Sequence, residues 1–178
     1  VVGADRDGVA RGVAAAEPAL LQHRHAMHAV VAGKVVGGGQ AMAAGADHVI
    51  NYRDDRFEGA VRKITKKRGV DVVFEHVGKD TWAGSMMVLR RGGRLVTCGS
   101  TSGVSAETNL MMLFQQQLRL IGSFGCNMRN LTDAMEKMAH GIVRPVIDTE
   151  LAFGDLGPAL ERMENRKVFG KIIMRIND

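Results

Sequence analysis

The sequence predicts an α/β fold, a doubly wound parallel sheet with helices on both of its faces. From residue 47 onward, short apolar segments alternate with amphipathic ones, and glycine-containing turns separate them. The 178 residues hold 22 glycines but only three prolines, which is typical of a glycine-turned α/β domain and not of a collagen-like or disordered chain. Right-handed crossovers in such a sheet place the ligand site at the carboxyl ends of the strands.

Four strands and four helices are expected to alternate in the central part of the chain. The strands are the apolar segments 48–50, 70–74, 94–97 and 118–121. The helices are expected at 56–67, 81–89, 110–117 and 131–140. The first of them shows the helical periodicity most clearly, because Phe57, Ala60, Val61 and Ile64 form one stripe. Gly69, a pair at 92–93 and Gly141 end three of these helices.

The two ends of the chain follow this pattern less well. Residues 1–2 and 29–32 predict strands, and residues 8–21 predict a helix in spite of Pro18. The glycines at 37–39 stand where the next helix belongs, at a cost of about 1 kcal/mol each relative to alanine. In the tail, a helix near 158–166 and a strand at 171–176 have no obvious place in the sheet, so we expect them to belong to a second domain.

Composition narrows the class of protein. The net charge of +5 comes from dispersed residues, and the runs at 66–68 and 90–91 precede expected strands, where cations complement helix carboxyl ends. No basic stripe indicates nucleic-acid binding. Cys98 and Cys126 lack the spacing of a zinc site or a disulfide framework, which favours a reducing cytoplasm. No signal peptide or membrane-spanning apolar stretch is found, and the methionines are expected to fill an aromatic-poor core.

Five segments in register resemble the medium-chain dehydrogenase/reductase superfamily. They are GADHVINY at 45–52, GVDVVFEHVG at 69–78, GGRLVTCGSTSG at 92–103, LIGS at 120–123 and VFGKII at 168–173. Within it, the chain is most similar to zinc-type alcohol dehydrogenases and quinone oxidoreductases. The resemblance implies a Rossmann-type dinucleotide-binding domain at residues 1–144. It also implies that residues 145–178 return to a GroES-like catalytic domain that this chain lacks.

The glycines near the start are candidates for the pyrophosphate loop. Gly3 and Gly8 match the first and third glycines of a GxGxxG motif, but Asp5 occupies the middle position, where backbone normally approaches the phosphates. The register usual in the family instead aligns Gly8 and Val9 with its Gly-Val-Gly turn. A plain turn is the alternative. Residues 11–44 fit the family badly, and a misread stretch is one hypothesis for them.

The residues after the expected strand 29–32 favour NADP(H) over NAD(H). No Asp or Glu occurs between Glu17 and Asp47, although an NAD-specific domain places an acid there for the ribose 2′-hydroxyl. Gly33 and Lys34 end that strand instead, and the lysine is suited to a 2′-phosphate. Relatives that resemble this pattern often add the tyrosine matching Tyr52. The alternative is that Lys34 is a solvated loop lysine.

The later strand ends supply the remaining cofactor-binding candidates. Resemblance assigns Val77 to cofactor packing and the backbone after the last strand to the nicotinamide carboxamide. After strand 94–97, a glycine permits close approach and hydroxyls can reach the ribose. A lysine near the end of the chain lies close to the cofactor in many relatives; the alternative is a plain turn before a strand. These candidates are Val77, Gly99, Ser100, Thr101, Gly122, Ser123, Phe124 and Lys171.

The sequence thus predicts the cofactor-binding portion of an NAD(P)H-dependent oxidoreductase. It would transfer hydride between nicotinamide and a small-molecule alcohol, carbonyl, quinone or enone. No catalytic residue or metal ligand is expected in this chain, which alone would be inactive, and zinc is possible only in the missing domain. A homodimer through strand 118–121 is expected. The alternatives are an S-adenosylmethionine-dependent methyltransferase and a non-catalytic dinucleotide-binding family member.

Overall fold

The computed structural model describes residues 30–33, 38–43, 45–51 and 56–176. Several expectations therefore lie outside the described residues: the glycine loop with Gly3, Gly8 and Val9, the strand at 1–2, the helix at 8–21, and the candidates Lys34 and Tyr52.

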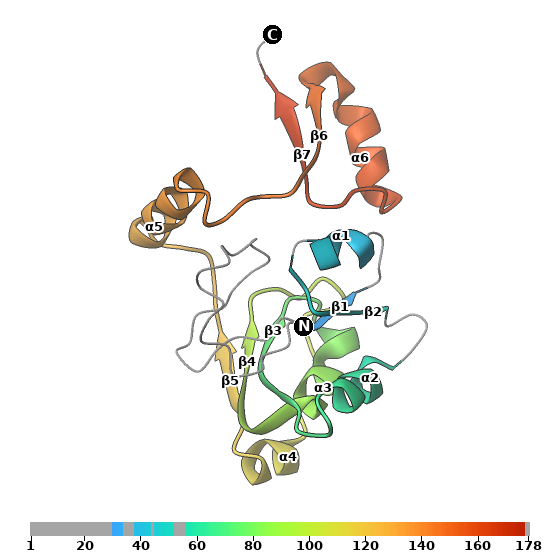
Figure 1. Cartoon of the computed structure of the whole chain (residues 1–178), viewed down its shortest axis with the longest axis vertical. Helices are drawn as coiled ribbons and strands as arrows, with labels where there is room; N and C mark the ends of the chain where they lie inside the picture. Colours follow the sequence, from blue (N-terminus) through green and yellow to red (C-terminus); the bar gives the residue numbers. More distant parts are fainter. Residues whose placement is uncertain (1–29, 34–37, 44, 52–55, 177–178) are drawn as a thin grey trace.

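Five described strands form two parallel groups (Figure 1). β1 (Val30–Gly33) pairs with β2 (His48–Asn51), and β3 (Val70–Glu75), β4 (Leu89–Thr97) and β5 (Arg119–Gly122) form a second sheet in that order. The expected strand at residues 1–2 would be strand 1 of the doubly wound order 3-2-1-4-5-6. On that count β1 and β2 are strands 2 and 3, and β3, β4 and β5 are strands 4, 5 and 6. All the pairings are parallel and a helix follows each strand from β1 to β5, so the predicted fold class is confirmed.

A helix follows each of these strands, and the last four lie close to their expected ranges. The helices are α1 (Gly38–Ala43), α2 (Phe57–Ile64), α3 (Lys79–Met87), α4 (Leu110–Gln115) and α5 (Met128–Ala139). α2 ends three residues early, because Lys66 and Lys67 have φ values of 51° and 68° that interrupt the helix. α3 begins two residues early, directly after Gly78, whose φ of 94° turns the chain out of β3.

β4 differs most from the sequence prediction, since it begins at Leu89 and not at residue 94. Its pairing with β3 moves from Val70–Leu89 to Val72–Arg94, so the glycines at 92–93 lie in an irregular excursion of the strand. The expectation that Arg90 ends a helix is wrong, because Arg90 lies in β4 and its Nε donates to the carboxylate of Asp71 on β3. That long-range ion pair leaves no trace in the local sequence.

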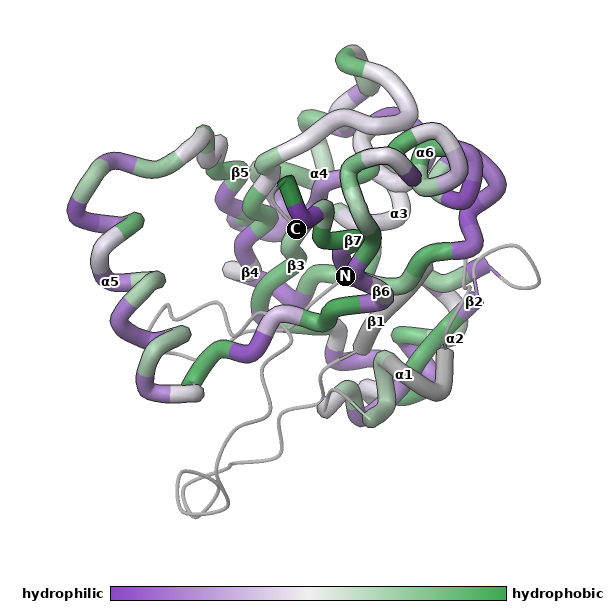
Figure 2. The backbone as a smooth tube through the Cα atoms, turned by 90° about the horizontal axis from the view of Figure 1, so that it is seen from above, coloured by the Kyte–Doolittle hydropathy of each residue, from purple (hydrophilic) through white to green (hydrophobic). Residues whose placement is uncertain are grey.

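Helix α5 lies away from the strands in two perpendicular views (Figure 1 and Figure 2). Its cap forms as the sequence allows, with the side chain of Asn127 accepting from the amide of Asn130 at 2.8 Å. Its apolar residues Leu131, Met135 and Met138 are exposed by 39–56 %. The expectation that the methionines fill the core is therefore confirmed for Met86 and wrong for these two methionines. It is also wrong for Met87 and Met111, which are 39 % and 61 % exposed.

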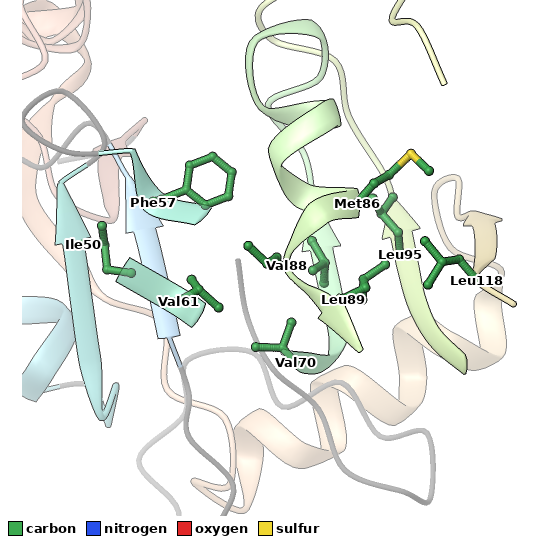
Figure 3. Close-up of a cluster of buried hydrophobic side chains, with 10 residues drawn as sticks. Ile50, Phe57, Val61, Val70, Met86, Val88, Leu89, Leu95 and Leu118 are labelled. Atoms are coloured by element: carbon green, nitrogen blue, oxygen red, sulfur yellow. The ribbon is translucent and has the colours of Figure 1, made fainter. Parts of the chain in front are cut away.

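The hydrophobic core lies between the β3–β4–β5 sheet and helices α2 and α3 (Figure 3). Phe57 and Val61 of α2 are buried, which confirms the predicted apolar stripe, and Leu95 of β4 and Met86 of α3 are almost completely enclosed. The β3 pattern VDVVFE buries residues from both faces, as expected for a parallel strand covered on two sides.

The tail forms a small unit of its own. β6 (Ile147–Ala152), the 3-10 turn Phe153–Asp155, α6 (Leu156–Glu164) and β7 (Lys171–Arg175) build one parallel βαβ unit, with β7 paired to β6. Asp148 holds the unit together by accepting from Arg162 at 2.7 Å and from the Phe169 amide at 3.1 Å. Figure 1 shows this unit apart from β3–β5. Its assignment to a second domain at residues 145–178 remains a prediction.

Candidate functional site

The carboxyl ends of β3, β4 and β5 form one continuous edge. Glu75, Thr97 and Gly122 are paired in register across the three strands. The hydrogen bonds continue beyond the last strand pairs, since the Cys98 amide donates to the Glu75 carbonyl at 3.0 Å and the Ser123 amide to the Thr97 carbonyl at 2.9 Å. The structure therefore brings the segments starting at residues 76, 98 and 123 together at one edge of the sheet, which we call the β3–β5 rim.

The loops after β3 and β4 are tied to each other at this rim. Thr101 donates to the His76 carbonyl from its amide at 3.4 Å and from its Oγ1 at 3.1 Å. Ser102 donates to the Val77 carbonyl from its amide at 2.7 Å and from its Oγ at 2.9 Å. The Ser102 Oγ also accepts from the Asp80 amide at 2.9 Å, at the start of α3. One loop thus fixes the backbone of the other.

Two glycines make this close approach possible. A Cβ on Gly78 would lie 2.7 Å from the Gly103 carbonyl oxygen, and the residue has a φ of 94° that L side chains rarely adopt. A Cβ on Gly99 would lie 3.0 Å from the His76 carbonyl oxygen. Glycine at these positions lets the two loops pack backbone to backbone.

Below the rim, the buried carboxylate of Glu75 fastens the turn from β3 into α3. Its Oε1 accepts from the amides of Val77 at 2.7 Å and Gly78 at 3.1 Å. The hydroxyl of Thr81 lies 2.9 Å from both carboxylate oxygens, and Ser85 donates to Oε2. Burial raises the pKa of Glu75, but the hydrogen bonds from Ser85, Gly78, Val77 and Thr81 together lower that pKa below its ordinary value.

Glu75 was not among the residues expected from the sequence. A signal for it exists, because Thr81 and Ser85 place two hydroxyls four residues apart on the helix face that packs on the sheet. Both residues are buried, as is the acid that ends the apolar strand. Buried polar residues on two adjacent elements indicate a shared hydrogen-bond network.

The surface of the rim is open where a ligand would approach. Ser100, Thr101 and Ser123 are exposed, and the side chain of Phe124 is fully exposed. A Cβ on Gly122 would meet no atom within 4 Å, so space remains next to the strand end. Val77 and Gly99 are half-buried beside it. Open backbone flanked by hydroxyls and apolar side chains fits a nucleotide at the strand ends of a doubly wound sheet.

Two other candidates lie elsewhere. Gly33 ends β1 in register with Asn51 of β2, so it belongs to the other strand group. Lys171 begins β7, is exposed and pairs with Ile147, so it lies in the tail unit and not in the β3–β5 rim.

The described residues do not form a metal centre. Among the parts of the chain that the structure describes, no three His, Cys, Asp or Glu side chains cluster in a way that could hold an ion. In the same residues, no helix has the length and apolar character needed to span a bilayer.

The strand order and the open, glycine-containing rim define a doubly wound α/β domain of the class that binds dinucleotides. The chain belongs to the zinc-binding dehydrogenase family, whose family model matches residues 44–174, and hence to the medium-chain dehydrogenase/reductase superfamily. The predicted resemblance is confirmed. The methyltransferase alternative has no support.

Individual relatives are oxidoreductases. The chain is 33 % identical to a crotonyl-CoA reductase of Streptomyces avermitilis over 117 residues, which covers 66 % of this chain and 26 % of that protein. It is 32 % identical to a quinone oxidoreductase of Salmonella typhimurium over 146 residues, which covers 76 % of this chain and 45 % of that protein.

A solved structure of the 2-octenoyl-CoA carboxylase reductase CinF, in complex with NADP and 2-octenoyl-CoA, is similar to the chain with a TM-score of 0.71 at 28 % identity. The match covers 82 % of this chain and 37 % of CinF. The chain thus spans between about a quarter and a half of the length of these proteins.

Proposed function

We propose that the chain is the cofactor-binding portion of an NAD(P)H-dependent oxidoreductase, which transfers hydride between nicotinamide and an alcohol, carbonyl, quinone or enone. The observation that carries the proposal is the β3–β5 rim, where three parallel strands end in register beside open backbone. Membership of the zinc-binding dehydrogenase family and the NADP bound in CinF support it.

The two strand groups divide the dinucleotide between them in this proposal. A doubly wound sheet consists of two mononucleotide-binding halves, of which the first takes the adenosine nucleotide and the second the nicotinamide nucleotide. Gly3, Gly8, Val9 and Gly33 then belong to the adenosine side. Val77, Gly99 and the residues that follow Gly99 and Gly122 belong to the nicotinamide side, with Lys171 reaching the cofactor from the tail.

The chemistry comes mainly from the cofactor, which supplies or accepts the hydride when bound. In this proposal the rim residues do three things. Backbone groups at Gly122 and Ser123 orient the carboxamide, Val77 packs against the nicotinamide ring, and the hydroxyls of Ser100 and Thr101 bind ribose. No step is assigned to zinc, because the described residues offer no ligand group for it.

NADP(H) is the preferred cofactor in this proposal. The stretch from residue 18 to residue 46 contains no carboxylate that would hold a free ribose 2′-hydroxyl or repel a 2′-phosphate. Lys34 follows β1 and Tyr52 follows β2 in the chain, and both are proposed to contact the 2′-phosphate. CinF was solved with NADP, which agrees with this preference.

A binding titration with one rim variant tests the proposal. We expect the chain to enhance nicotinamide fluorescence saturably with NADPH, more weakly with NADH, and to bind no S-adenosylmethionine. Gly122→Leu should keep the fold, since the added Cβ meets no atom within 4 Å, but the side chain should block the rim and abolish NADPH binding. Gly154→Leu, also in open space but in the tail unit, is the matched control. Equal NADPH affinity in both variants would contradict the proposed site.

We further propose a homodimer formed through β5 and a location in the cytoplasm. Among the described strands, β5 ends the order β3-β4-β5, so its outer side is available for pairing with a second copy. Two exposed cysteines agree with a reducing compartment.

A further inference from the structure

Glu75 is the only described acidic side chain that is buried, and its setting is unusual for a residue far from solvent. It is 3 % exposed, and its hydrogen-bond donors among the described residues are two backbone amides and two hydroxyls, none of which carries a charge. A buried carboxylate without a cationic partner is costly unless donors satisfy its oxygens. Here the donors of Val77 and Gly78 belong to the rim itself.

The arrangement connects the core to the rim in both directions. From the core side, Ser85 and Thr81 of α3 hold the carboxylate, which in turn holds the amides of Val77 and Gly78. From the loop side, Ser102 holds the carbonyl of the same Val77. The peptide groups on both sides of Val77 are therefore fixed, so its side chain has a defined direction.

We infer that Glu75 is a positioning residue that sets Val77 against the nicotinamide half of the cofactor. The inference rests on the proposed function, which places the nicotinamide at the β3–β5 rim. Glu75 itself does not touch the cofactor, because it is buried beneath the turn. Its effect is transmitted by the amides of Val77 and Gly78.

A positioning role predicts weaker binding at one half of the site only, whereas a general contribution to stability predicts weaker binding at both halves. Loss of the Glu75 carboxylate should loosen the nicotinamide side of the site and leave the adenosine side, formed by the other strand group, unchanged. NADPH reports on both halves of the site, whereas 2′,5′-ADP reports on the adenosine half alone. The ratio of the two affinities therefore measures positioning separately from folding.

The test compares these two ligands on the full chain and on four variants. In Glu75→Gln an amide NH₂ replaces an acceptor among donors, and we expect NADPH affinity to fall about tenfold, as for a lost hydrogen bond to a charged group. The affinity for 2′,5′-ADP should not change. Thr81→Val removes one donor to the carboxylate without adding another. It should lower NADPH affinity by less than Glu75→Gln does, again with unchanged affinity for 2′,5′-ADP. Glu75→Asp, which keeps the charge, should recover part of the NADPH affinity.

Asp71→Asn is the matched control, since Asp71 lies at the opposite end of β3 and pairs with Arg68 and Arg90. It should change neither affinity. Unchanged NADPH affinity in Glu75→Gln and Thr81→Val, or an equal loss of both ligands in Thr81→Val, would overturn the inference. If the unmodified chain binds 2′,5′-ADP but not NADPH, or binds neither, the proposed function itself fails, which is distinguishable from failure of the variants alone.

Discussion

The Val77 carbonyl oxygen accepts two hydrogen bonds from Ser102, 25 residues further along the chain, and these bonds join the rim loops after β3 and β4. The amide and the Oγ of Ser102 lie 2.7 and 2.9 Å from the Val77 carbonyl oxygen. The same Oγ accepts from the Asp80 amide, so one hydroxyl connects the loop after β4 with the start of α3. The shape of the proposed nicotinamide site therefore depends on a contact between loops that the sequence places far apart.

Ser102→Ala should loosen this contact while the chain stays folded. The Val77 carbonyl keeps its bond from the Ser102 amide, and Ser102 is half-buried, so we expect a cost of about 1 kcal/mol in the free energy of unfolding. NADPH affinity should fall severalfold, because the Asp80 amide loses its acceptor. Urea denaturation and fluorescence titration measure the two effects. Ser105→Ala, at an exposed position on the same loop, is the control, and an effect of equal size there would contradict the specific role of Ser102.

Gly78→Ala should destabilise the chain, whereas Gly59→Ala should stabilise it. At Gly78 the φ of 94° and the Gly103 carbonyl 2.7 Å from the added Cβ oppose any side chain, with an expected cost of about 1–3 kcal/mol. At Gly59, inside α2, an added Cβ meets open space, and alanine should gain about 0.5–1 kcal/mol from helix propensity. Urea midpoints of the two variants should move in opposite directions. A stable Gly78→Ala chain would mean that the turn relaxes easily.

The sequence predicted the order and type of the elements better than their boundaries. Alternating apolar strands and amphipathic helices are local patterns, and the stripe that includes Phe57 and Val61 is buried as expected. The sequence predicts the start of β4 at residue 94 and not at Leu89, because Arg90 and the glycines that follow look locally like a helix end. Its true state depends on the partner Asp71, 19 residues away.

The candidate site was likewise predictable in outline but not in detail. Parallel strands must end at one edge, so the sequence predicts Val77, Gly99 and Gly122 near one another. The register pairs Glu75, Thr97 and Gly122, so the segments that follow β3, β4 and β5 begin at the same edge. The sequence predictions do not include the support beneath them. Glu75 follows the expected strand 70–74, and the spacing of Thr81 and Ser85 is its one sequence signal; the packing of α3 on the sheet brings both hydroxyls to its carboxylate.

Acidification should destabilise the chain through Glu75. Its pKa in the folded chain lies below the ordinary value of 4.5, so the unfolded chain binds the proton more readily. The stabilisation is therefore fully present above pH 4.5 and is lost as the pH falls through the lower folded-state pKa. Urea midpoints between pH 7 and pH 3 should show this loss, and Glu75→Gln should flatten the curve below pH 4.5.

Asp148 contributes to the same loss of stability at low pH, so it can be compared with Glu75. The Phe169 amide first, and Arg162 in addition, lower the pKa of Asp148 below its ordinary value. Asp148→Asn should therefore also reduce the loss of stability at low pH. If Glu75→Gln and Asp148→Asn both leave the loss of stability at low pH unchanged, other carboxyl groups control it.

The edge of β5 provides the test of the proposed dimer. Ile121 lies on this strand and is 42 % exposed, which is a large apolar exposure for a strand whose outer side is not paired among the described strands. A second copy related by a twofold axis would pair β5 with β5 and cover both Ile121 side chains.

A lysine at position 121 places two like charges close together at such an interface. Ile121→Lys should therefore convert a dimer into a monomer, as measured by light scattering during size-exclusion chromatography. Ile173→Lys, on β7 with a similar exposure of 39 %, should leave the mass unchanged. A monomeric unmodified chain would contradict the proposed dimer. A dimer that survives the Ile121 change and is lost with the Ile173 change would place the interface at β7 and not at β5.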